Sequence, residues 1–125
     1  MKAEQLHDLV ERIEIAVGSD PDLAAAVLDS MKSAFPNEAE LMTLEYGLTE
    51  STEAALHLIS LHVPNWSIKL QGHAHEPDGR WTCTLRESAM GDDDELIGIG
   101  RGSTPALALL AALLRLLEIA ARGYP

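Results

Sequence analysis

The chain is poor in cysteine, in aromatic residues and in basic residues, and it contains no long apolar run. The single cysteine, Cys83, excludes an internal disulfide and is typical of a protein of the reducing cytosol. No apolar signal region opens the sequence, and the longest apolar run, 106–114, is far shorter than the roughly 18–20 residues of a membrane span. We therefore expect a cytoplasmic protein without a membrane segment.

Acidic residues outnumber basic ones, and the formal net charge is −11. Residues 1–48 carry three Lys or Arg against ten Asp or Glu, and residues 49–125 carry six against ten. Neither half predicts the basic surface that nucleic-acid binding requires, so nucleic acid is a disfavoured partner. The acidic charge favours solubility and steers the chain toward a basic protein partner.

Helical spacing of apolar residues predicts an N-terminal pair of helices. They span 4–17 and about 21–35, with a tight connection at Gly18 that makes a helical hairpin. For residues 37–50 the pattern favours no single type of secondary structure, and a short helix over 38–44 is one alternative. A further helix, 52–62, begins after Ser51 as its N-cap and carries Ala55, Leu56, Ile59 and Val63 on one side, which we expect to be its buried side.

Alternating polarity then predicts strands. Trp66, Ile68 and Leu70 alternate with Ser67, Lys69 and Gln71, and Trp81, Cys83 and Leu85 alternate with Thr82, Thr84 and Arg86. The turn sequence at 76–79 joins these runs as a hairpin, and a third strand follows from Glu95 to Gly100. Glycines in that strand weaken it or let another backbone approach closely.

The last helix is predicted at about 105–121, with Thr104 and Pro105 at its start and Gly123 after its end. We expect one stripe of it to face water, and that stripe consists of Ala108, Ala111, Arg115, Glu118 and Arg122. The rest of its circumference is rich in leucine. The sheet must cover one side of this helix, and the N-terminal hairpin or a second subunit must cover another.

The predicted fold class is α+β. We expect an α-β-β-β-α domain over 49–125, with a three-stranded antiparallel sheet and two helices on one face. An acidic helical hairpin and connecting segment, 1–48, precede it.

Two groups of residues are candidate ligand sites. His73, His75 and Asp78, with Glu76, cluster beside the hairpin turn and suit a divalent metal, although exposed histidines at a strand end explain the same pattern. The second group is a glycine-rich turn before the last helix, a place that suits an anion. Its members are Gly100, Arg101, Gly102, Ser103 and Thr104. The alternative is structural, with the glycines bending the backbone and Ser103 or Thr104 capping the helix.

The remaining distinctive side chains have structural interpretations. Cys83 fits a small buried apolar residue, and Trp66 and Trp81 fit packing under the helices better than a stacking platform for bases. The polar residues of the first two strands lie on the opposite sheet face. That face is either solvated or a binding surface, and the sequence leaves both open.

Several segments together resemble small prophage-encoded proteins with an α-β-β-β-α "phage ABA sandwich" domain. They are residues 49–56, the tetrapeptide Val63-Pro-Asn-Trp66, the hairpin, and residues 103–115. Many of those proteins also open with a leucine-rich helix, as residues 6–13 do here, and then a helix like 22–27. The resemblance implies that fold and a phage or prophage accessory role, and it carries no catalytic residues.

The order of elements is also similar to the double-stranded RNA-binding domain, in which a lysine cluster at the start of the last helix grips phosphate. Here that position reads Ser103-Thr-Pro-Ala-Leu-Ala, with only Arg101 nearby. The similarity therefore concerns topology and does not by itself imply function.

No group of nucleophile, base, metal ligands or cofactor loop stands out, so we predict no catalytic residue and no cofactor. The favoured function is a non-catalytic protein-binding module of phage type. Its partner is an unknown, basic protein, for instance one whose nucleic-acid site the chain occupies as an acidic decoy, or a second copy bound through the last helix or the hairpin. Nucleic-acid binding and a metal- or anion-dependent enzyme are the alternatives.

Overall fold

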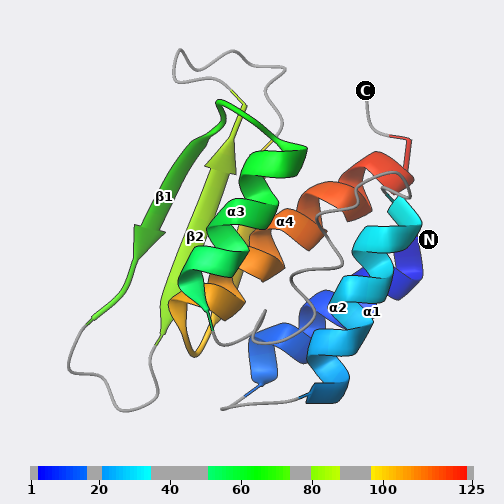
Figure 1. Cartoon of the computed structure of the whole chain (residues 1–125), viewed down its shortest axis with the longest axis horizontal. Helices are drawn as coiled ribbons and strands as arrows, with labels where there is room; N and C mark the ends of the chain where they lie inside the picture. The colour runs from blue at the N-terminus through cyan, green and yellow to red at the C-terminus, as the bar shows by residue number, and fades with distance from the viewer. Residues whose placement is uncertain (1–2, 17–20, 35–50, 74–79, 88–96, 124–125) are drawn as a thin grey trace.

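The computed structural model describes residues 3–16, 21–34, 51–73, 80–87 and 97–123, and within these ranges the chain forms four helices and three strands (Figure 1). In chain order they are α1 (Ala3–Ile15), α2 (Pro21–Ala34), α3 (Thr52–His62), β1 (Ser67–Gln71), β2 (Trp81–Arg86), β3 (Ile97–Gly102) and α4 (Pro105–Ala121). The strands form one antiparallel sheet in the order β1-β2-β3. The predicted α+β class with a three-stranded antiparallel sheet is confirmed.

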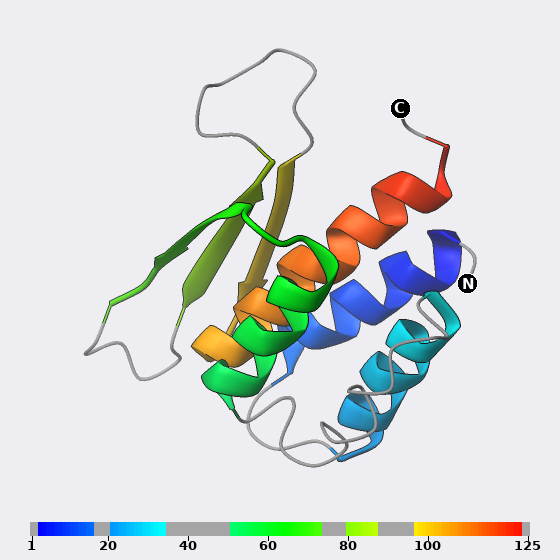
Figure 2. The same ribbon diagram turned by 45° about the horizontal axis from the view of Figure 1, so that its top comes forward.

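The helices all lie on one side of the sheet, as the tilted view in Figure 2 shows. α4 packs directly on the sheet, and α3 packs beside α4. α1 packs on α4 and reaches β3, whereas α2 packs on α1 and is farther from the sheet. The opposite side of the sheet therefore carries no helix of the described part of the chain.

The apolar spacing in the N-terminal segment correctly predicts two helices and their buried sides. The buried side chains are Leu6, Leu9, Val10 and Ile13 in α1 and Leu23, Val27, Leu28 and Met31 in α2. α1 ends at Ile15, two residues before the predicted end, and α2 is described as far as Ala34, because Phe35 lies outside the described residues. Gly18 and the possible helix at 38–44 lie outside the described residues.

α3 begins as predicted, because the hydroxyl of Ser51 accepts a hydrogen bond from the Ala54 N–H at 3.1 Å. The side predicted to be buried is slightly wrong. Leu58 is fully buried, whereas Leu56 is 38% exposed. The buried set Ala55, Leu58 and Ile59 follows the i, i+3, i+4 spacing of one helix face, which is the geometry that packing on α4 requires.

The pairing of β1 with β2 puts their alternating residues on the two sides of the sheet that the sequence predicts. Ile68 lies opposite Leu85, and Leu70 lies opposite Cys83, so these apolar side chains share the face under the helices. The third strand, described as Ile97–Gly102, ends two residues later than predicted, because its pairing with β2 continues to Trp81 opposite Gly102. Glu95 lies outside the described residues.

Three glycines of β3 allow α4 to contact the sheet with its backbone. A Cβ atom built on Gly100 would collide with the Ala112 nitrogen and would lie 2.7 Å from the Ala108 oxygen. The same atom on Gly98 would lie 2.7 Å from the Ala112 oxygen, and on Gly102 it would lie 2.7 Å from the Ala108 nitrogen. Among the described glycines only Gly123 has a positive φ. The glycines of β3 therefore allow the close approach of another backbone, which is one of the two roles that the sequence suggests for them, and a positive φ for a sharp bend is not found at these positions.

α4 begins and ends at the predicted residues. The Thr104 hydroxyl accepts a hydrogen bond from the Leu107 N–H at 3.2 Å, Pro105 occupies the first turn, and Gly123 follows the C-terminus with φ +77°. The predicted water-facing stripe is wrong for three of its members. Ala108 and Ala111 are fully buried, and Glu118 is only 5% exposed, because α1 and β3 pack where water was expected.

One hydrophobic core contains side chains from all four helices and from β2. It includes residues of both predicted domains, 1–48 and 49–125, because α1 covers α4. The predicted boundary between those domains lies in 35–50, outside the described residues. None of the described helices has the length and apolar character that crossing a membrane requires.

Candidate functional site

The side of the sheet that faces away from the helices carries nine side chains, and we call this surface the outer sheet face. It consists of Ser67, Lys69 and Gln71 of β1, Thr82, Thr84 and Arg86 of β2, and Ile97, Ile99 and Arg101 of β3. The six residues from β1 and β2 are those that alternation predicts for this face. The three residues from β3 were not assigned to it from sequence.

The outer sheet face is basic in an acidic protein. Three of its nine side chains are cationic, namely Lys69, Arg86 and Arg101, and none of the nine is acidic. All three are exposed. Because the whole chain has a net charge of −11, the rest of it carries −14. A local field of this sign at one open surface attracts anionic groups.

The same face also exposes apolar surface. Ile97 is 38% exposed and Ile99 is 47% exposed, and because they are two residues apart on β3 they lie side by side. Across the sheet, Ile99 lies next to Thr84, which lies next to Lys69. Exposed isoleucines beside cations form a surface that can bury apolar groups and also recognise carboxylates.

Polar groups of the residues predicted to bind an anion already form hydrogen bonds with other residues of the protein. The Arg101 N–H donates to Oε2 of Glu14 at 3.2 Å, and the Ser103 hydroxyl donates to the Ala16 carbonyl at 2.9 Å. Thr104 caps α4, while Gly100 and Gly102 are buried against that helix. An external anion here would have to displace the Glu14 carboxylate.

The predicted metal ligands are only partly described. His73 is exposed just beyond β1, whereas His75, Glu76 and Asp78 lie outside the described residues. Within the ranges that are described, no three His, Cys, Asp or Glu side chains gather as metal ligands would. The metal site at this turn stays a prediction.

Cys83 and the two tryptophans lie on the helix side of the sheet. Cys83 is fully buried, and burial raises the pKa of its thiol to about 11, so the thiol is protonated at neutral pH. Trp66 and Trp81 are partly buried against the core, and the Trp81 ring lies over Gly72. These positions confirm the structural interpretation of Cys83 and remove both tryptophans from the outer sheet face.

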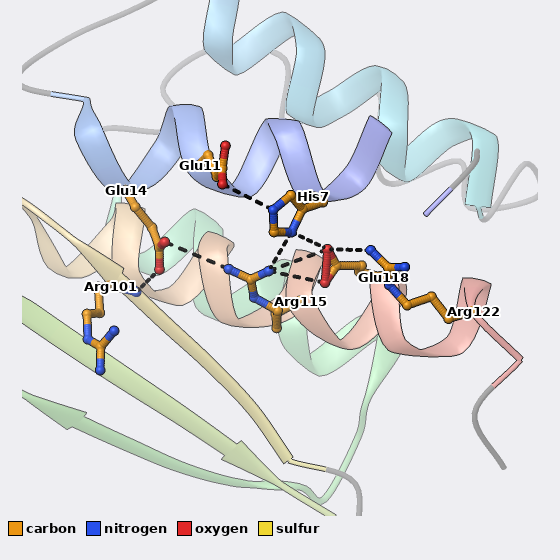
Figure 3. A network of polar contacts seen from close by, with 7 residues as sticks. All are labelled: His7, Glu11, Glu14, Arg101, Arg115, Glu118 and Arg122. Carbon is orange, nitrogen blue, oxygen red and sulfur yellow. Dashed lines mark hydrogen bonds and ion pairs between the residues drawn. The ribbon is translucent and has the colours of Figure 1, made fainter. Parts of the chain in front are cut away.

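A network of charged side chains joins α1 to α4, and Figure 3 shows it at close range. At its centre, Glu118 accepts from His7 Nδ1 at 2.7 Å and from Arg115 Nη1 at 3.1 Å. The other ring nitrogen of His7 lies 3.1 Å from Glu11, and Arg115 Nη1 lies 3.2 Å from Nδ1. Glu14 lies 3.8 Å from Arg115. The network thus ties two helices together.

The sequence pattern does not predict this network, because Arg115, Glu118 and Arg122 lie on the stripe of the last helix that is expected to face water. A usable signal was present, since Arg115 and Glu118 are three residues apart and Glu118 and Arg122 are four apart on one helix face. His7 and Glu11 show the same spacing on α1. What the spacing does not reveal is that these two faces contact each other.

The environment of Glu118 acts on its pKa in two opposite ways. Burial of the carboxylate raises the pKa, but hydrogen bonds from Arg115 and His7 and the positive charges of both outweigh burial. The pKa of Glu118 is therefore lower than its ordinary value of 4.5. A carboxyl group with a lowered pKa in the folded state stabilises that state above its ordinary pKa, and this contribution is lost as the pH falls through the lowered pKa.

Glu118→Gln is expected to lower the free energy of unfolding at pH 7 by about 1–3 kcal/mol, because hydrogen bonds to a charged group contribute about that much. The difference from the unmodified protein should shrink as the pH falls below 4.5, the ordinary value. Urea unfolding followed by circular dichroism between neutral and acidic pH measures it. Asp29→Asn, at an exposed position of α2, is the control. A difference that stays constant into strong acid would contradict the assignment.

Comparisons of the chain with protein-family models, with curated proteins and with solved structures find no match. Inference about function therefore depends on the chemistry of the described surfaces. Among these surfaces, the outer sheet face combines exposure, charge of one sign and apolar area. In the network between α1 and α4, by contrast, the charged groups bind one another and stabilise the packing of the two helices.

Proposed function

We propose that the chain is a non-catalytic protein-binding module and that the outer sheet face is its binding surface. The observation that carries this proposal is the charge of that face. It carries Lys69, Arg86 and Arg101 and no acidic side chain, in a chain whose net charge is −11. Ile97 and Ile99 add exposed apolar area at the same place.

The composition of the face favours a protein over a nucleic acid. Binding to a nucleic-acid backbone uses many cations, and single strands also need aromatic platforms for the bases. The nine residues of the outer sheet face include only three cations and no aromatic side chain. A protein surface with carboxylates around an apolar centre matches cations beside isoleucines better.

The sequence resemblance is what supports a phage-type origin for the module. The order α3, β1, β2, β3, α4 is compatible with the α-β-β-β-α order of the phage ABA sandwich domain that the sequence resembles. The proposal is accordingly an accessory protein of phage or prophage type that acts by occupying a partner.

A basic partner, which the overall charge suggests, would meet a different surface. Exposed acidic side chains lie on the helical side, for example Glu4, Asp8 and Glu11 on α1 and Asp22 and Asp29 on α2. The face of the sheet and the helical side thus suit partners of opposite charge. On the helical side the large exposed apolar side chains of the described residues are single ones on separate helices, Ile15 on α1 and Leu56 on α3. Ile97 and Ile99, by contrast, are neighbours on one strand beside the cations. We therefore place the binding site on the outer sheet face.

Photocrosslinking tests the proposed surface. A photoreactive amino acid replaces Thr84, at the centre of the outer sheet face, or Ala25, at an exposed position of α2 as the control. In cells that express the chain, we expect one discrete protein adduct from position 84 and none from position 25. Mass spectrometry identifies the adduct.

Charge reversal supplies the matched control for this experiment. Lys69→Glu should lower the yield of the adduct about tenfold, as the loss of about 1.4 kcal/mol of binding free energy would. Lys32→Glu makes the same change of charge at an exposed position of α2 and should leave the yield unchanged. A nucleic-acid adduct, equal adducts from both positions, or no adduct at position 84 would overturn the proposal.

A further inference from the structure

The two edge strands of the sheet differ in how their outer backbone groups are used. At the β3 edge, α1 approaches the strand, and Glu14 accepts a hydrogen bond from the Arg101 N–H at 3.2 Å. Just beyond β3, the Ser103 hydroxyl donates to the Ala16 carbonyl at 2.9 Å. At the other edge, the described part of the chain supplies no strand beyond β1. Four of the five residues of β1 are exposed and the fifth is half-buried.

The alternation of antiparallel hydrogen bonds shows which groups of β1 face outward. The Arg101 N–H points away from β2. The backbone N–H and C=O of its neighbour Gly100 therefore point toward β2, where Gly100 and Cys83 form a hydrogen-bonded pair. The backbone N–H and C=O of Thr84, next to Cys83, then point the other way, toward Lys69 of β1. It follows that Ile68 and Leu70 direct their N–H and C=O groups to the open side of β1.

The side chains along this edge define the chemistry of a strand that would add to it. On the outer side, Lys69 stands between Ser67 and Gln71, so the edge presents one cation and no carboxylate. On the inner side, Ile68 is 40% exposed and Leu70 is half-buried. An added strand would therefore place acidic side chains next to Lys69 and apolar side chains next to Ile68.

A second copy of the chain matches this edge poorly. The antiparallel register that pairs all five residues of β1 with β1 of another copy is centred on Lys69, so each Lys69 would lie directly opposite the other. Like charges directly opposite in adjacent strands are destabilising. Two chains of net charge −11 also repel each other.

We infer that β1 binds one extended segment of a partner protein as a fourth strand, with alternating acidic and apolar residues in that segment. The inference rests on the proposed function and deepens it, since the added strand extends the outer sheet face past Lys69. Main-chain hydrogen bonds to Ile68 and Leu70 supply affinity, while Lys69 and Ile68 select the side chains.

The test uses a blocked peptide of about eight residues, the length of a typical strand, in which glutamate and valine alternate. Two derivatives carry N-methyl groups, one on every valine nitrogen and one on every glutamate nitrogen. N-methylation removes the donors on one edge of the peptide strand. If the peptide binds antiparallel to β1, N-methylation of the valines should lower its affinity at least tenfold and N-methylation of the glutamates should not. If the peptide binds parallel to β1, the glutamate derivative should lose affinity instead.

Two readouts on the protein localise the interaction. The amide protons of Ile68 and Leu70 should exchange at least tenfold more slowly when the peptide binds, whereas those of Lys69 and Gln71, which face β2, should change little. Lys69→Glu should weaken peptide binding about tenfold. The matched variant Lys32→Glu on α2 should leave it unchanged.

The outcomes separate this inference from the proposed function. If Lys69→Glu weakens binding but neither N-methyl set does, and exchange at Ile68 is unchanged, the outer sheet face binds and strand addition is wrong. A dimer formed through β1 without peptide would also overturn strand addition by a partner. The inference is also overturned if the peptide does not bind at about 1 mM in low salt, which corresponds to a binding free energy weaker than about −4 kcal/mol. In that case photocrosslinking still decides the proposed function.

Discussion

Gly100→Ala is expected to lower the free energy of unfolding by about 3 kcal/mol or more, and Gly100→Val is expected to prevent folding. The added Cβ atom would collide with the backbone of α4 at Ala112 and would lie 2.6 Å from the carbonyl carbon of Ala111. A backbone cannot move aside as a flexible side chain can, so α4 would have to lift from the sheet. Since α4 contacts the sheet, α1 and α3, the whole core would loosen. Urea unfolding measured by circular dichroism gives the change.

Two other glycines serve as controls for this substitution. Apart from its chain neighbours, no atom of the described residues lies within 4 Å of a Cβ added at Gly123, and its φ is +77°, so Gly123→Ala should cost only about 1 kcal/mol of backbone strain. Gly98→Ala should be intermediate, because one of the atoms it meets, Cγ of Leu116, belongs to a side chain that can shift. Equal costs at positions 100 and 123 would contradict the close approach of α4 and β3.

Local signals in the sequence predict the helices and their ends well. Ser51 and Thr104 cap α3 and α4 as expected, and Gly123 follows α4 in the conformation that a helix end favours. Each of these signals acts through hydrogen bonds or backbone angles within a few residues. Such short-range physics is fully contained in the sequence around the residue.

The role of β3 is harder to predict because its polarity is reversed. In most half-buried strands the apolar residues face the core. Here the glycines Gly98 and Gly100 face the core, and Ile97 and Ile99 face outward, since α4 lies too close to leave room for side chains. The sequence therefore predicts the polar residues of β1 and β2 on the outer sheet face but not the apolar part or Arg101.

The ion network shows the same limit of sequence reasoning. A helix face with Arg115, Glu118 and Arg122 reads as solvent-exposed, because charged residues are rarely buried without partners. The partners come from α1, more than 100 positions away, through His7 and Glu118. Only the packing of α1 on α4 reveals that these charges satisfy each other.

Ala111→Lys is expected to lower the free energy of unfolding by about 4 kcal/mol or more, enough to unfold a protein of ordinary stability in part. Ala111 is fully buried on α4, although the pattern of the helix predicts that it faces water. A lysine there would place an ammonium group in the core or would push neighbouring elements apart. Both outcomes are costly because a buried charge without a partner loses its hydration. Soluble yield and urea unfolding measure the effect.

Ala120→Lys is the matched control, since Ala120 is exposed near the end of the same helix and has the same intrinsic helix preference. It should change stability by about 0.5 kcal/mol or less. Ala111→Ser keeps the result measurable if the lysine variant does not fold, and it should cost about 1–3 kcal/mol because a hydroxyl is buried. Equal stability of the lysine variants at positions 111 and 120 would mean that this side of α4 faces solvent, as the helix pattern alone predicts, and that α1 does not cover it.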